Sequence, residues 1–191
     1  MAAMIAKRYR GFVLPLILVA CAQAPEGPER VVEPRVSAQA APRGSALLKS
    51  VMLAAHNGAR GDVGVAPLVW SDTLVASARG YAEDMARSGR FEHAAQPMAP
   101  GRLGENLWTG TRGAYRYDEM AGHWIAERGD FVNLPTPNFS RTGRAQDVTH
   151  YTQIVWRGST AVGCALASNR TDDFLVCRYA PAGNVMGQAA Y

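Results

Sequence analysis

The sequence has only three cysteines, no apolar run long enough to cross a membrane, and little net charge beyond its first residues. Its apolar run, GFVLPLILVA, has ten residues, whereas a membrane-spanning helix needs about 20. Three of the 20 basic residues fall within the first ten positions, which leaves 17 basic residues against 16 acidic ones. This nearly neutral remainder argues against nucleic-acid binding, which needs clustered basic side chains.

The motifs of the common enzyme classes are also absent. The sequence contains no HExxH zinc motif, no P-loop, no Rossmann glycine fingerprint and no GxSxG nucleophile elbow. It has four histidines, of which His123 stands four residues before Glu127 in HWIAE. That spacing places both side chains on neighbouring helical positions, which by itself is a weak functional signal. Motifs alone therefore indicate no enzyme class.

The N-terminus is predicted to be a targeting segment. A basic start followed by a short apolar run is typical of a signal peptide, here residues 1–20. LVAC, which ends at Cys21, resembles the bacterial lipobox, whose cysteine is lipidated and becomes the new first residue. Because Ala22 follows, not aspartate, we expect an outer-membrane lipoprotein exported from a bacterium. Ordinary cleavage after Ala22 is the alternative and would give a soluble secreted or periplasmic protein.

The segment after Cys21 has the composition of a tether. Residues 22–45 contain four prolines and no apolar periodicity. Such a segment cannot bury enough apolar surface to fold by itself. We therefore expect residues 21–45 to connect the membrane anchor to one folded domain, residues 46–191.

Spacing predicts the elements of that domain. Apolar residues at helical intervals predict helices at 46–60, 73–89 and 118–127. Two apolar-rich runs around a polar turn predict a hairpin of strands 161–168 and 173–181. TQIVW, residues 152–156, fits a third strand because its side chains suit a pleated surface. Long loops are expected at 90–112 and 129–149. Helices first and an antiparallel sheet late indicate an α+β layered domain.

The hairpin brings the two remaining cysteines together. With residues 169–172 as its loop, Cys164 on one strand lies opposite Cys177 on the other. Opposed Cβ atoms on neighbouring strands are close enough for a disulfide. An even pair in an exported domain supports the bridge. Two buried free thiols are the alternative.

Two polar residues interrupt apolar patterns. Glu127 continues the helical stripe of Met120 and Trp124, and a carboxylate there is costly unless it is paired or lines a wet cavity. It either faces an internal polar site or, because Gly129 follows, turns into water at the helix end. His150 begins an apolar run and is either a core histidine or a ligand at the lip of a cavity. Spacing leaves both questions open.

Several short motifs together resemble the CAP superfamily of cysteine-rich secretory proteins, venom antigens and plant pathogenesis-related proteins. They stand in the family's order: HNGAR (56–60), PLVW (67–70), FEH (91–93), GENL (104–107), HWIAE (123–127), HYTQIVW (150–156), GC (163–164) and VCRYAPAGN (176–184). The resemblance covers nearly all of residues 46–191. It implies a three-layer α-β-α sandwich with an antiparallel sheet and a large surface cleft.

The resemblance also implies a site. The family's cleft tetrad falls on His93, Glu105, Glu127 and His150. The two histidines would hold Zn²⁺ or another divalent cation, and the two carboxylates would hold or activate water, which makes them the catalytic candidates. His123 lies outside the tetrad.

Three further residues and three functions follow from the same resemblance. His56, Asn57 and Arg60 would form a structural hydrogen-bond cluster.

The first function is non-enzymatic binding of a lipid or small amphiphile at the cell envelope, with the membrane contacted through the N-terminal anchor. It is preferred because the tetrad lacks a nucleophile and a third strong metal ligand. The alternatives are a peptidase-like, metal-assisted hydrolase and a structural or host-facing envelope protein.

Overall fold

The structure, a computed structural model, describes residues 39–96 and 101–191. The predicted signal peptide, Cys21 and most of the predicted tether lie outside these residues. The described chain forms these helices and strands in order: α1 (Ser45–Asp62), β1 (Val69–Trp70), α2 (Asp72–Ser88), β2 (Gly104–Thr111), α3 (Tyr117–Ala126), α4 (Thr149–Ile154), β3 (Ala161–Ser168) and β4 (Asp172–Ala180). Two short 3-10 helices, η1 (Glu127–Gly129) and η2 (Ala145–Val148), precede α4. None of the described helices is long and apolar enough to span a bilayer.

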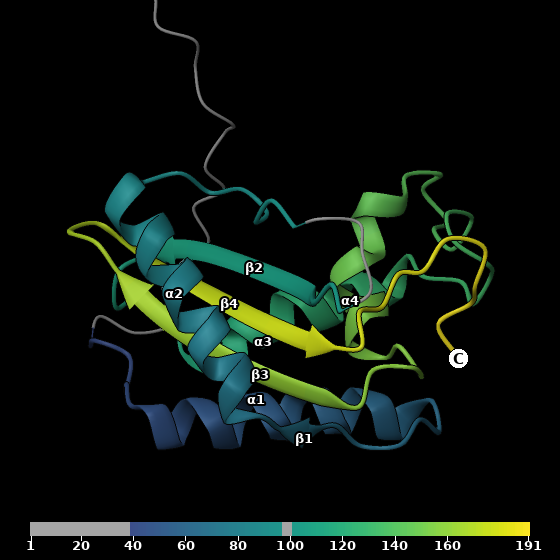
Figure 1. Ribbon diagram of the computed structural model, residues 1–191, viewed down its shortest axis with the longest axis horizontal. Coiled ribbons are helices and arrows are strands. Elements are labelled where there is room, and N and C mark those ends of the chain that lie inside the picture. Colours follow the sequence, from purple (N-terminus) through teal and green to yellow (C-terminus); the bar gives the residue numbers. More distant parts are fainter. Residues whose placement is uncertain (1–38, 97–100) are drawn as a thin grey trace, which may run out of the picture. The chain divides into compact units, whose positions relative to one another are not determined.

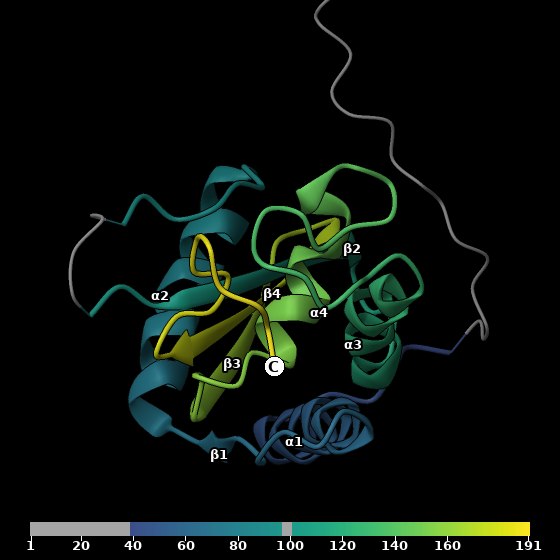
Figure 2. The ribbon, with the colours of Figure 1, turned by 90° about the vertical axis from the view of Figure 1, so that its right-hand side faces the viewer.

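One sheet separates two helical layers (Figures 1 and 2). Its strand order is β1-β3-β4-β2. Along β4, Leu175 and Cys177 pack with α1, α3 and α4, whereas Phe174 and Val176 pack with α2. Side chains of a strand alternate between faces, so a strand covered on both faces is apolar throughout. The expected α-β-α sandwich is therefore present, although the sheet is mixed because β1 runs parallel to β3.

The predicted hairpin is confirmed in register. Cys164 lies opposite Cys177 and Leu166 opposite Leu175. The two cysteines form a disulfide with their Cα atoms 4.1 Å apart. The bridge therefore joins the two central strands of the sheet on the face that packs against α1 and α3.

The predicted strand at 152–156 is wrong. THYTQI is the short helix α4, and the chain turns after it. The Oε2 atom of Glu127 accepts the backbone N–H groups of His150 and Tyr151, each at 3.0 Å. Those amides have no partner inside the helix, so the carboxylate stabilises the helix start. Tyr151 and Ile154, three residues apart, are both buried. Tertiary contacts thus override the strand preference of these residue types.

The expected loop at 90–112 is also wrong in its second half. GENLWTGT is β2, which pairs along its whole length with β4. Its glycines suggested a loop, but Gly104 marks a close approach within the sheet. A Cβ atom there would lie 2.1 Å from Gln153 Oε1. Glycine inside a strand often has this meaning.

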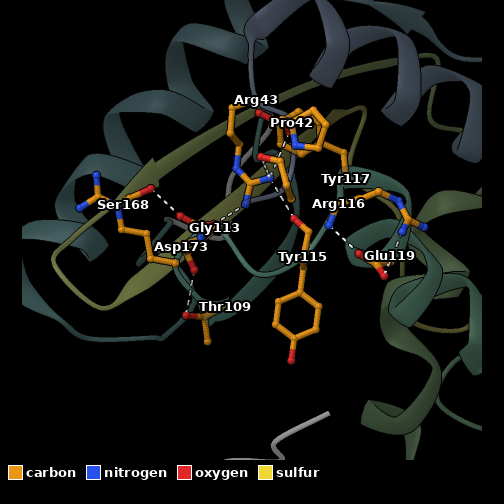
Figure 3. A network of polar contacts seen from close by, with 12 residues as sticks. Pro42, Arg43, Thr109, Gly113, Tyr115, Arg116, Tyr117, Glu119, Ser168 and Asp173 are labelled. Atoms are coloured by element: carbon orange, nitrogen blue, oxygen red, sulfur yellow. Dashed lines mark hydrogen bonds and ion pairs between the residues drawn. The ribbon is translucent and has the colours of Figure 1, made fainter. Parts of the chain in front are cut away.

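Residues 41–43, which the sequence assigns to the tether, include two that contact the domain: the backbone N–H of Ala41 donates to the Gly113 carbonyl at 2.9 Å, and Arg43 binds from its side chain (Figure 3). Arg43 Nη2 donates to Asp173 Oδ2 at 2.6 Å, and Arg43 Nη1 donates to the carbonyl of Tyr115 at 2.9 Å. Asp173 is 1% exposed and also accepts from the backbone N–H of Gly113 and the hydroxyl of Ser168. These contacts fix the point at which the chain enters the domain.

Candidate functional site

The first half of the site joins the segment after α2 to β2. His93 Nδ1 lies 2.6 Å from Glu105 Oε1, and the backbone N–H of Ala94 donates to the same oxygen at 3.1 Å. The Glu105 side chain is 5% exposed and that of His93 is 65% exposed. A buried carboxylate therefore holds an exposed imidazole.

Arg178 on β4 compensates the charge of Glu105. The strand register places the two residues opposite each other, and Arg178 Nη1 lies 2.9 Å from Glu105 Oε2. The contact is an ion pair without hydrogen-bond geometry. Burial lowers the pKa of the Arg178 guanidinium, and the neighbouring Glu105 charge opposes that shift. The guanidinium also lies over the ring of Tyr81. An isolated buried carboxylate would be costly, so Arg178 is what permits Glu105 at this position.

The second half of the site joins the end of α3 to α4. Glu127 Oε1 lies 2.5 Å from His150 Nδ1, and the Glu127 side chain is 18% exposed. The indole of Trp124 stacks against the imidazole of His150 at 6.1 Å between ring centroids. Of the two orientations that the sequence left open, Glu127 points inward, toward α4. His150 is 28% exposed in its side chain and lines a cavity, so it is not a core residue.

Both histidines line one cavity of about 260 Å³. Each uses Nδ1 on a carboxylate, which leaves Nε2 as the ring nitrogen that can meet a ligand. Metal-binding histidines commonly have this arrangement, in which the carboxylate fixes the tautomer and the ring orientation. Within residues 39–96 and 101–191, no group of three or more His, Cys, Asp and Glu side chains is arranged to hold a metal ion. The described cavity therefore offers two imidazole nitrogens but no third side chain grouped with them as a metal ligand.

The CAP family model, described as the cysteine-rich secretory protein family, matches residues 53–179. The chain belongs to the CAP family. The match includes all four tetrad positions and both cysteines, and the assignment confirms the family that the motifs indicated.

Curated relatives support the assignment. The chain is similar to a PR-1 type pathogenesis-related protein from Sambucus nigra, 38% identical over 138 residues, which covers 72% of this chain and 78% of the relative. Pathogenesis-related protein 1C from Nicotiana tabacum is 36% identical over 140 residues, covering 73% and 78%.

Solved structures share the fold. The crystal structure of NaASP2 with Zn²⁺ superposes with a TM-score of 0.63 at 23% identity, covering 79% of this chain and 89% of that one. An outer surface protein from Borrelia burgdorferi gives a TM-score of 0.50 at 13% identity, covering 72% and 95%. At these identities the likeness concerns the fold alone.

His56, Asn57 and Arg60, which were expected to be structural in this CAP domain, all hydrogen-bond to other parts of the domain. His56 is fully buried, with Nδ1 2.7 Å from the Met52 carbonyl and Nε2 2.7 Å from the Tyr179 hydroxyl. Arg60 is 1% exposed and donates to four backbone carbonyls. Asn57 exchanges two hydrogen bonds with the backbone of Leu68, next to β1. These contacts tie α1 to the sheet and to the chain after α4.

His123 lies apart from the tetrad. Its Nδ1 accepts the indole N–H of Trp108 at 2.8 Å, and its ring stacks against that indole. It does not line the cavity of the tetrad. The pairing of His123 with Glu127 that their spacing allows is not what the structure shows, because Glu127 binds His150.

Sequence reasoning missed three residues that build the site. Arg178 compensates Glu105, and a charged residue in the middle of a buried strand was an available signal. Gln153 accepts the backbone N–H of Gly183 at 2.8 Å, and Asn184 donates to the Thr149 carbonyl at 3.0 Å. These two amides fasten α4 to the C-terminal segment and so shape the cavity wall. Both residues stand in motifs that carried the family resemblance, HYTQIVW and VCRYAPAGN, but neither motif indicated this fastening role.

Proposed function

We propose that this CAP domain is a non-enzymatic binding module whose cleft holds a divalent cation, with Zn²⁺ as the preferred ion, through Nε2 of His93 and His150. The supporting observation is that each imidazole is held at Nδ1 by a carboxylate and both line one cavity. Neutral imidazole is a common zinc ligand, and two ligands leave coordination positions open. The similarity in fold to NaASP2, crystallised with Zn²⁺, supports the choice of metal.

A hydrolase is less well supported, because its candidate bases are already engaged. Glu127 Oε1 contacts His150, and its Oε2 accepts two backbone N–H groups. Glu105 Oε1 contacts His93 and Ala94, and its Oε2 faces Arg178. A general base needs an oxygen within reach of the attacking water. The two carboxylates instead position the histidines.

We further propose that the protein acts outside the cytoplasm, anchored at Cys21. Membership of a secretory family and the Cys164–Cys177 disulfide support export, since disulfides persist in oxidising compartments. Likeness in fold to a bacterial outer surface protein agrees with an envelope location. The lipid or amphiphile ligand stays a prediction, and mass spectrometry of lipids that co-purify with the protein would test it.

Isothermal titration with Zn²⁺ tests the cation site. We expect the wild-type protein to bind, and His93→Gln and His150→Gln each to lose binding while their circular dichroism stays native. His123→Gln is the matched control, since it removes an imidazole outside the cavity. Affinity should fall in acid because protons compete with the metal for neutral imidazole. Undiminished binding by the double variant of His93 and His150 would refute the proposal.

A further inference from the structure

β3 has one edge that the described chain leaves largely uncovered. β1 pairs with β3 only at Ala161 and Val162, and the chain then turns into α2. β3 continues to Ser168 with β4 on its other side. Figure 2 shows β1 between α1 and α2, the helices of opposite layers. Trp70 is the last residue of β1. Beyond it lies a cavity of about 650 Å³, which is lined by residues of α1, α2 and β3.

The backbone groups of β3 that face this cavity can be identified. The Val162 carbonyl accepts the Ser71 N–H at 2.9 Å, so it points toward the side of β1. The direction of the backbone N–H and C=O groups repeats every two residues along a strand. The backbone groups of Cys164, Leu166 and Ser168 therefore also point to that side. Independently, the Cα atoms of Cys164 and Cys177 are only 4.1 Å apart. This is the close spacing of a pair that exchanges no backbone hydrogen bonds.

The outward groups of these three residues have no hydrogen-bond partner in the part of the chain that the structure describes. Cys164, Leu166 and Ser168 all line the cavity, and it is their outward backbone groups that face it. Uncovered strand edges of this kind are templates for pairing with another chain. The cavity begins where β1 ends, so it lies where an edge strand would continue.

The walls carry an excess of positive charge. Lys49, Arg79 and Arg112 line the cavity, are exposed, and have no carboxylate partner among the described residues. The fourth lining cation, Arg43, is bound to Asp173. Asp72 is a second lining carboxylate beside Asp173, so the four lining cations still exceed the lining carboxylates by two. Apolar side chains such as those of Trp70, Val75 and Leu166 also line the wall.

We propose that the open edge of β3 binds an extended acidic peptide as an added strand between α1 and α2. About five residues at about 3.3 Å each cover the edge from Cys164 to Ser168. Main-chain hydrogen bonds would come from β3, and the carboxylates of the peptide would reach Lys49, Arg79 and Arg112. Strand addition of this kind takes affinity from the main chain and specificity from the side chains.

Fluorescence anisotropy with labelled synthetic peptides tests the proposal on the full chain. The probe is a hexapeptide of alternating glutamate and valine, compared with its lysine-for-glutamate counterpart. Two further versions carry N-methyl groups on either set of alternate residues. We expect the acidic peptide to bind and the lysine peptide not to bind. One methylation set should weaken binding roughly tenfold or more, since it removes hydrogen bonds to β3, and the other should have little effect.

Variants of the protein locate the binding site. Arg79→Glu should weaken binding of the acidic peptide, and Arg157→Glu should not, since it makes the same charge change at an exposed residue outside the cavity. Leu166→Pro removes one outward N–H group without taking a donor from the β4 ladder. If it does not fold, the methylated peptides still decide the question.

Three results would overturn strand addition. The first is equal weakening by both methylation sets, which would indicate contact without main-chain pairing. The second is binding of oleate, sensitive to Arg79→Glu, with no binding of the acidic peptide. That outcome would assign the cavity to an amphiphile. The third is dimerisation through this edge with no peptide bound, which would assign it to a second copy of the chain.

Discussion

At the scale of single residues, the four histidines of this domain differ in what holds them. His93 and His150 are bound to carboxylates and line a cavity. His123 accepts from an indole, and His56 is buried between a backbone carbonyl and the Tyr179 hydroxyl. Burial lowers the pKa of His56 to about 4. The same residue type is thus a candidate ligand in two places and is held by hydrogen bonds away from the cavity in the two others.

The lowered pKa of His56 predicts a loss of stability in acid. The unfolded chain binds this proton near pH 6.5 and the folded chain only near pH 4, so between these values the unfolded state holds more protons. Stability from this residue is complete above about pH 6.5 and falls by about 3 kcal/mol as the pH drops to 4. The free energy of unfolding in urea, measured from pH 7 to 4, should show this decline.

His56→Gln is the comparison, because glutamine does not titrate and can still form hydrogen bonds. The difference between the wild type and the variant removes the contribution of the other titrating groups, since these are common to both. The variant should lose most of the slope between pH 6.5 and 4. Parallel curves for the two proteins would show that His56 is not the group responsible.

At the scale of elements, local pattern predicted the long helices and the hairpin but not the two pieces that complete the site. α1, α2 and α3 have apolar residues at helical spacing, and the β3–β4 register follows from its turn. α4 has only six residues, and distant partners fix it, above all Glu127. β2 pairs with β4, whose paired residues lie 61 to 75 positions away in the sequence, and its glycines were typical of a loop. Single-sequence patterns do not report such distant contacts.

Glu127 links the end of α3 to both α4 and His150, so its replacement separates two roles. Glu127→Gln keeps an oxygen that can accept the α4 amides but loses the charge that holds the His150 imidazole. We expect Zn²⁺ affinity to fall about 10- to 100-fold, as for other groups that orient a metal ligand. The free energy of unfolding should change by about 1 kcal/mol or less.

Calorimetric titration with Zn²⁺ and urea unfolding measure these two effects separately. Glu119→Gln is a suitable control, since Glu119 lies in the first turn of α3, the helix that Glu127 follows, and hydrogen-bonds only near the helix start. It should leave Zn²⁺ affinity unchanged. A Glu127→Gln protein that binds Zn²⁺ as tightly as the wild type would contradict the positioning role.

At the scale of the whole molecule, residue spacing predicted a layered fold, and the family resemblance predicted which four residues form the tetrad. Helices followed by a hairpin predicted an α+β layered domain, the resemblance implied an α-β-α sandwich, and this sandwich is what forms. Neither source predicted how the tetrad divides into two carboxylate–histidine pairs, since that depends on which segments meet. Nor did composition predict that residues 41–43 contact the domain, because Arg43 finds its partner Asp173 130 positions away.

The chain enters the domain at Arg43, which is held by Asp173 and the carbonyl of Tyr115. If Cys21 is lipidated, about 20 residues separate the membrane from this point. Cys21→Ala should then release the protein into the soluble fraction. Ala22→Asp is the control, because it leaves the lipidated cysteine in place. This variant should stay membrane-bound but move from the outer to the inner membrane. Fractionation of cells and mass spectrometry of the N-terminal peptide measure both effects. A wild-type protein that is soluble and begins at Gln23 would show that the signal peptide is simply cleaved.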